Sequence, residues 1–110
     1  MARSFRVLLT RDAARDLRGI YEYIANADSL PAAGQVLERL QTVRQQLARL
    51  PERGSHPAEL AALGIGEYRQ LLLKPYRIIY RVVGKTVIIY LIADWRRDMP
   101  ALLARRLLCG

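Results

Sequence analysis

Arginine side chains and the only tryptophan gather in the second half of the chain. Four cations and one flat aromatic ring there have the residue types that bind anions or acidic surfaces: Arg69, Arg77, Trp95, Arg96 and Arg97. A guanidinium presents a fork of N–H donors that matches a carboxylate or phosphate, and an indole ring beside it adds an apolar contact. We therefore expect Arg77, Trp95, Arg96 and Arg97 to belong to a surface that binds an acidic target.

Two of these residues have a second interpretation. Side chains alternate along a strand, so Arg77 and Arg81 share one face of the segment Tyr76–Val83. That face either contributes to the target-binding groove or is solvated, with arginine stems lying along it. Trp95 either reaches the target or packs a last helix onto the sheet.

Groups that transfer protons are scarce in the sequence. The single histidine, His56, lies in a loop beside Pro57, and a loop histidine without evident partners is more often solvated than catalytic. The chain has no spacing typical of a metal cluster, no phosphate-cradling glycine loop and no nucleophile triad. We therefore expect no cofactor and no metal.

The overall charge points to an acidic partner. The 18 Lys and Arg exceed the 10 Asp and Glu, for a formal net charge of +8, and the excess is concentrated from Glu67 onward. Direct nucleic-acid binding stays open, as does a basic surface with no polyanion partner. The chain has no apolar run near the ~20 residues of a membrane span, and we expect a cytoplasmic protein.

The 110 residues fit one domain, 1–110. The single cysteine, Cys109, is expected to be incidental, because it cannot form an internal disulfide. Apolar residues recur at spacings of three and four positions over Arg11–Ala27, which predicts a helix with Thr10 as its cap. The same spacings return from about residue 30 until Pro51 and predict a second helix. Few residues separate these two helices, which predicts an antiparallel hairpin.

Four segments are typical of strands, and the predicted fold class is α+β. They are residues 5–9, 67–73, Tyr76–Val83 and 86–93, the last three forming an antiparallel meander. Asp98 is expected to cap a short final helix, and a helical turn is expected near residues 58–63. The order is β-α-α-β-β-β-α, with the first strand in the same sheet and the helix hairpin packed on one sheet face.

This order of elements, together with several short segments, resembles the RelE/ParE superfamily of toxins over nearly the whole chain. The segments are Leu9-Thr10-Arg11-Asp12-Ala13, Asp16-Leu17 with Ile20-Tyr21, Leu50-Pro51-Glu52-Arg53-Gly54, Tyr68-Arg69, Tyr76-Arg77-Ile78-Ile79-Tyr80 and Asp94-Trp95-Arg96-Arg97-Asp98. The resemblance implies a toxin that a small dimeric, ParD-like antitoxin neutralises by folding a disordered tail over it. RelE-like members cut mRNA on the ribosome, whereas ParE-like members inhibit DNA gyrase.

The final helix favours the ParE-like activity. RNA cleavage through the 2′-hydroxyl needs a base and an acid as well as cations, and RelE-like members supply a tyrosine from this helix. After Asp98 the sequence has no Tyr, His, Lys or Glu, and arginine is a poor base. We therefore predict a gyrase inhibitor that is not an enzyme. The resemblance also implies that Arg69 joins Arg77, Arg96 and Arg97 among the cations that bind the target. A ribonuclease with Arg69, Arg77 and Arg97 on the phosphate and Asp94 or Asp98 as base is the alternative, and a degenerate toxin that only binds its antitoxin is a third.

Antitoxin binding is expected on the helix hairpin. Apolar residues of its two stripes are first of all core, but some extend to a second side where an amphipathic tail can dock or a strand can be added. The residues expected to bind the antitoxin are Leu17, Tyr21, Tyr23, Ile24 and Leu37.

Overall fold

The computed structural model describes residues 4–108, so Cys109 lies outside the described residues. The elements are β1 (Arg6–Leu9), α1 (Arg11–Ala27), α2 (Leu30–Arg49), α3 (Ala58–Ala61), β2 (Tyr68–Leu73), β3 (Tyr76–Val83), β4 (Thr86–Asp94), α4 (Met99–Leu103) and the π-helical η1 (Ala104–Leu108). The predicted α+β class and element order are confirmed. The π-helical extension of the last helix was not predicted.

One four-stranded sheet forms the middle layer, in the order β1-β4-β3-β2. β2, β3 and β4 make the predicted antiparallel meander, and β1 pairs in parallel with β4. The β3–β4 turn is two residues long, because Val83 pairs with Thr86, and Gly84 there adopts φ 60°. Glycine takes this left-handed conformation without steric cost, which explains the tight connection.

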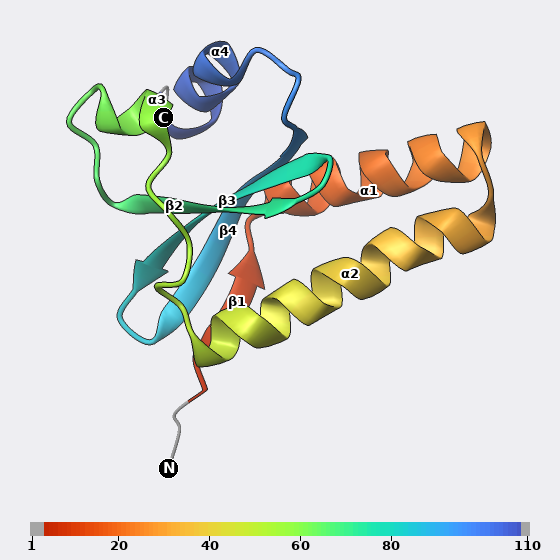
Figure 1. Ribbon diagram of the computed structural model, residues 1–110, viewed down its shortest axis with the longest axis horizontal. Coiled ribbons are helices and arrows are strands. Elements are labelled where there is room, and N and C mark those ends of the chain that lie inside the picture. Colours follow the sequence, from red (N-terminus) through yellow and green to blue (C-terminus); the bar gives the residue numbers. More distant parts are fainter. Residues whose placement is uncertain (1–3, 109–110) are drawn as a thin grey trace.

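The two long helices form a hairpin on one face of the sheet (Figure 1). The Thr10 hydroxyl accepts a hydrogen bond from Ala13 N at 3.0 Å, and the Ser29 hydroxyl accepts one from Ala32 N at 3.1 Å. Each cap satisfies an N–H group that the first helical turn leaves unpaired. The buried core under the hairpin combines α1, α2 and the sheet: Ala13, Leu40, Val43, Leu47, Leu73, Ile78, Tyr80, Val87, Ile89 and Ile92.

The opposite face of the sheet is also covered. α3 and α4 lie over it (Figure 1) and form a second core with side chains that point away from the hairpin. Its buried members are Leu60, Tyr68, Ile79, Leu91, Ala93, Met99, Leu102 and Leu103. The strands are therefore apolar on both faces.

A β-bulge and a free edge shape β4. Ile79 pairs with Leu91 but Tyr80 pairs with Ile89, so Tyr90 is the extra residue. The parallel ladder with β1 ends where Leu9 pairs with Ile89, while β4 continues to Asp94. Residues 90–94 therefore leave one edge of β4 without a partner strand.

Candidate functional site

The turn after β4 presents Trp95, Arg96 and Arg97 at the surface. Trp95 N donates to Pro75 O at 2.9 Å, and Arg97 N donates to Asp94 O at 3.1 Å. Trp95 is 46% exposed, so the last helix does not enclose it. Asp98 then caps α4 by accepting from Ala101 N at 3.3 Å, as predicted. We call Trp95, Arg96 and Arg97 the β4 corner.

Asp94 holds the β4 corner in place. Its carboxylate accepts from Arg96 N at 2.9 Å and from the Arg96 guanidinium at 3.0 and 2.8 Å. These hydrogen bonds from Arg96 lower the pKa of Asp94 to about 2 from its ordinary 3.8, and the same pairing raises the pKa of Arg96. Arg97 is the corner cation whose guanidinium has no hydrogen bond or ion pair within residues 4–108.

Arg77 pairs with Ala93, two residues before the β4 corner, but it is not open to solvent, which corrects the expectation of an exposed arginine on that strand face. It is 9% exposed, and its guanidinium forms a two-pronged ion pair with Glu59 of α3 at 2.7 and 2.9 Å. The Gln70 side-chain oxygen accepts two further hydrogen bonds from it. Arg77 lowers the pKa of Glu59, and these two partners engage four of the five N–H donors of its guanidinium.

Arg69 also serves the fold. Its guanidinium donates to Glu52 O at 3.1 Å and to Gly54 O at 2.8 Å, which fastens the loop after α2 to β2. Alternation along β2 places Arg69 on the hairpin side with Leu71, whereas Gln70 and its partner Arg77 lie on the α3 side. The structure therefore places Arg69 and Arg77 on opposite faces of the sheet, each bonded to other parts of the fold.

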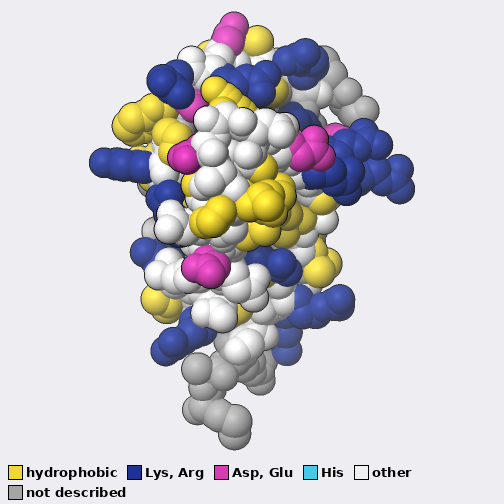
Figure 2. Space-filling view, turned by 90° about the vertical axis from the view of Figure 1, so that its right-hand side faces the viewer, with side chains coloured by type: hydrophobic (Ala, Val, Ile, Leu, Met, Phe, Trp, Pro, Cys, Tyr) yellow, Lys and Arg dark blue, Asp and Glu magenta, His cyan; other side chains and the backbone are white. Residues whose placement is uncertain are grey.

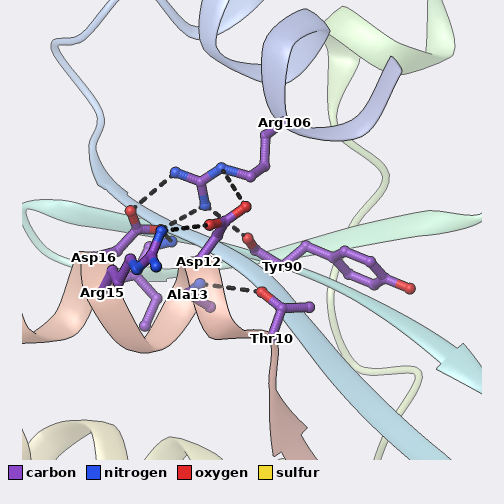
Figure 3. A network of polar contacts seen from close by, with 8 residues as sticks. Thr10, Asp12, Ala13, Arg15, Asp16, Tyr90 and Arg106 are labelled. Atoms are coloured by element: carbon purple, nitrogen blue, oxygen red, sulfur yellow. Dashed lines mark hydrogen bonds and ion pairs between the residues drawn. The ribbon is translucent and has the colours of Figure 1, made fainter. Parts of the chain in front are cut away.

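An ion pair closes part of the free edge of β4 (Figure 3). Arg106 of η1 forms two hydrogen bonds with the Asp16 carboxylate at 2.9 and 3.0 Å and donates to Tyr90 O at 2.9 Å. Asp16 in turn accepts from Ile92 N at 3.0 Å. Two side chains thus satisfy backbone groups that a partner strand would otherwise satisfy. The pairing raises the pKa of Arg106.

A groove of about 640 Å³ runs between α1 and this end of β4, and we call it the β4-edge groove. Its lining residues are Arg15, Asp16, Gly19, Ile20, Tyr23, Ile24, Ala27, Asp28, Pro75, Tyr76, Ile92, Ala93, Asp94, Arg96 and Arg97. It thus brings two residues expected to bind antitoxin, Tyr23 and Ile24, next to two expected to bind the target. Figure 2 shows hydrophobic side chains at the centre of the end where α1 meets α2, with Lys and Arg gathered to the sides.

The other residues expected to bind antitoxin lie on the opposite side of α1. Leu17, Tyr21 and Leu37 line an apolar groove of about 370 Å³ that also includes Leu9 of β1. Leu37 is 40% exposed. We call this the hairpin groove. The expected antitoxin residues therefore occupy two surfaces, one on each flank of the core stripe of α1.

The described residues hold little acid or base chemistry. Burial is the first cause that raises the pKa of Tyr68, Tyr76 and Tyr80, while Asp94 and Glu59 have lowered pKa values. His56 is exposed, and its Nδ1 lies 3.1 Å from Tyr68 O. Within residues 4–108 no three His, Cys, Asp or Glu side chains are placed to hold a metal ion.

Three residues whose ion pairs fix the fold around these surfaces were not predicted as site residues. Glu59, Asp16 and Arg106 find their partners 18, 76 and 90 positions away in the chain. Such distances leave no periodic or local signal in a sequence. Only Asp16 has a feature in the sequence that indicates a special role, because it is a charged residue beside the apolar stripe of α1.

A mixed four-stranded sheet, a helix hairpin on one face and a cationic turn after β4 place this molecule in the class of RelE/ParE superfamily toxins. The family model of the ParE toxin of type II toxin-antitoxin systems, parDE, matches residues 7–99, and the chain belongs to this family. No helix in the described part of the chain is long and apolar enough to cross a membrane.

Known relatives agree with this assignment. Toxin ParE3 of Caulobacter vibrioides is 28% identical over 101 residues, which cover 92% of this chain and 97% of that protein. A chain of the chromosomal ParDE system from P. aeruginosa matches with a TM-score of 0.68 at 24% identity, over 83% of this chain and 96% of that one. The toxin-antitoxin complex RelBE2 from Mycobacterium tuberculosis matches with a TM-score of 0.58 at 23% identity, over 86% and 95%. These solved structures share the fold.

Proposed function

We propose that this toxin acts in the cytoplasm by binding and inhibiting DNA gyrase, that it does so without catalysis, and that a ParD-type antitoxin neutralises it. The observation that carries the proposal is the β4 corner, where a half-exposed Trp95 stands beside Arg96 and Arg97. An aromatic ring with flanking arginines is the composition of the energetic centre of many protein interfaces. Membership of the ParE family supports the same activity.

The chemistry of the β4 corner supports binding rather than catalysis. A general base for RNA cleavage needs a pKa near neutrality, and Arg96 keeps Asp94 ionised with a pKa of about 2. Asp94 is therefore a weak base that is also occupied by hydrogen bonds. Arg77, which could have held a phosphate, is paired with Glu59. The target surface we propose is accordingly Trp95, Arg96 and Arg97, and Arg69 and Arg77 support the fold behind it.

The hairpin groove is the proposed primary docking surface for the antitoxin. Leu17 and Tyr21 of α1 and Leu37 of α2 are exposed enough to cover an apolar helix or strand. Leu37→Asp should weaken the antitoxin complex at least about tenfold, because a charged group would be buried there. Titration calorimetry with the antitoxin measures this loss, and unchanged affinity would place the antitoxin elsewhere.

A supercoiling assay tests the proposed target. Purified wild-type toxin should inhibit gyrase or trap its cleavage complex, and Trp95→Ala and Arg97→Ala should each weaken this effect about tenfold or more. Arg105→Ala is the matched control, because Arg105 is an exposed cation of η1 outside the grooves described above. Gyrase that supercoils normally at saturating toxin would exclude it as the target.

The second candidate function is ribosome-dependent mRNA cleavage. The observation that favours it is the likeness in fold to a chain of the RelBE2 complex. Asp98 would then be the remaining carboxylate near the β4 corner, although it caps α4. A translating extract with reporter mRNA decides between the two functions: wild-type toxin should leave the message intact, and sharp cuts would favour the ribonuclease.

A further inference from the structure

The β4-edge groove has an apolar floor that nothing within residues 4–108 covers. Ile20 and Ile24 of α1 and Tyr76 of β3 line it, and Tyr23, which also lines it, is 64% exposed. Gly19 leaves the α1 wall open, because a Cβ built there meets no atom within 4 Å. The groove therefore has room for a side chain or a short segment of another molecule.

The charges around the groove favour an acidic occupant. Two of its three lining carboxylates are already paired, Asp16 with Arg106 and Asp94 with Arg96, and Asp28 lies at the far end of α1. By contrast, Arg97 has no side-chain partner among the described residues, and Arg15 has only the exposed Asp12 at 3.8 Å. A carboxylate brought into the groove can form a charge-assisted contact with either of these lining arginines.

We propose that the β4-edge groove is a second docking site for the ParD-type antitoxin, which inserts an apolar side chain against Ile20, Ile24 and Tyr76 and sets a neighbouring carboxylate against Arg97 and Arg15. The inference rests on the proposed function, since it assumes an antitoxin partner. Arg96 and Arg97 line the groove and also belong to the β4 corner. An occupant here covers the proposed target surface, so antitoxin and target compete for it directly.

A substitution that fills the groove tests the proposed contact of the antitoxin's apolar side chain. Gly19→Phe puts a ring into the open space, whereas Gly19→Ala adds one methyl group at the same helical position and serves as the matched control. The probe is the purified ParD-type antitoxin encoded with this toxin, titrated by calorimetry. Gly19→Phe should bind it at least about tenfold more weakly than Gly19→Ala, which should match wild type within about twofold. A thermal melt of each variant verifies folding.

Reversing the charge of Arg97 tests the proposed contact with a carboxylate of the antitoxin. Arg97→Glu should weaken the antitoxin complex at least about tenfold, and the affinity of this variant for the antitoxin should depend less on salt than that of wild type. Arg105→Glu changes the net charge equally on an exposed residue outside the groove and should have little effect. Equal losses in both variants would show that only net charge matters and would overturn the proposed contact.

The outcomes separate this inference from the proposed function. If wild-type toxin binds the antitoxin but Gly19→Phe binds it equally well, the groove is not a docking site. The proposed function, a toxin that an antitoxin neutralises, is then unaffected. If wild-type toxin does not bind the antitoxin, both fail. If toxin alone is a dimer by light scattering and Gly19→Phe makes it a monomer, the groove takes a second copy of the chain, which also overturns the inference.

Discussion

The arginines of β2, β3 and the turn after β4 differ in what neutralises them. Arg77 is enclosed by Glu59 and Gln70, and Arg69 is bound to two backbone carbonyls. Arg96 is paired but exposed, and Arg97 has no side-chain partner in the described chain. Because Arg77 is nearly buried and most of its donors are engaged, the exposed Arg96 and Arg97 of the β4 corner are more accessible to a target than Arg77 is.

The Arg77–Glu59 pair should contribute to stability. Glu59→Gln keeps the shape of the side chain but leaves the charge of the buried Arg77 without a counter-ion. We expect a loss of about 2 kcal/mol in the free energy of unfolding, below the range for fully buried pairs because Glu59 is partly exposed. Urea denaturation measures it. Asp12→Asn, at an exposed residue, is the control, and equal stability of Glu59→Gln and wild type would contradict this role.

Asp94 should make stability depend on pH in the acid range. Its pKa in the folded protein, about 2, lies below its ordinary 3.8, so the folded state holds the proton less tightly than the unfolded chain does. The contribution is fully present above pH 3.8 and is lost as the pH falls toward 2. Wild type should therefore exceed Asp94→Asn in stability at pH 5, with a difference that shrinks by pH 3. A constant difference would contradict the lowered pKa.

At the scale of elements, α1 is the organising helix. Its core stripe packs on the sheet, one flank lines the hairpin groove and the other lines the β4-edge groove. An α-helix is about 10 Å across, so the two grooves are separated by little more than the helix itself. One partner molecule can therefore contact both flanks.

Two glycines should respond in opposite ways to the same substitution. Gly19→Ala should stabilise the protein by about 0.5–1 kcal/mol, because alanine favours the helix and its methyl group enters open space. Gly54→Ala should destabilise it clearly, since a Cβ there would lie 2.6 Å from Gln70 O and from the Tyr80 hydroxyl. Thermal unfolding of both variants measures the contrast. Equal effects would show that the loop after α2 is not held tightly against β3.

The Asp16–Arg106 pair should hold the C-terminal segment. Asp16→Ala removes the partner of Arg106 and the acceptor of Ile92 N, so hydrogen exchange should speed up at Ile92 and along α4 and η1. Asp12→Ala is the matched control on the same helix, because Asp12 lies 3.9 Å from Arg106 and is mostly exposed. Unchanged exchange in Asp16→Ala would mean that the second core alone fixes the segment.

Local features of the fold could be predicted from sequence, and non-local ones could not. The caps Thr10 and Asp98 and the Gly84 turn depend on neighbouring residues and were predicted. The bulge at Tyr90, the π-helical η1 and the covered second face depend on how distant segments pack. For the same reason the β4 corner could be proposed from sequence, whereas the burial of Arg77 could not.

At the scale of the whole molecule, charge and shape act together. The net charge of +8 favours the approach of acidic partners, and the grooves are the places where we propose that they dock. The proposed target surface and the β4-edge groove share Arg96 and Arg97. If the antitoxin docks in the β4-edge groove as proposed, occlusion alone neutralises the toxin and no change of the toxin's conformation is required.

The most direct test of the central claim is to induce the toxin alone in bacteria and to follow DNA and protein synthesis separately in the first minutes of growth arrest. Inhibition of gyrase predicts early loss of DNA synthesis, with filamentation and DNA-damage signalling, while protein synthesis continues. The Arg97→Ala variant should delay this arrest and Arg105→Ala should not. Immediate loss of protein synthesis with cleaved mRNA would contradict the account and make the chain a ribonuclease.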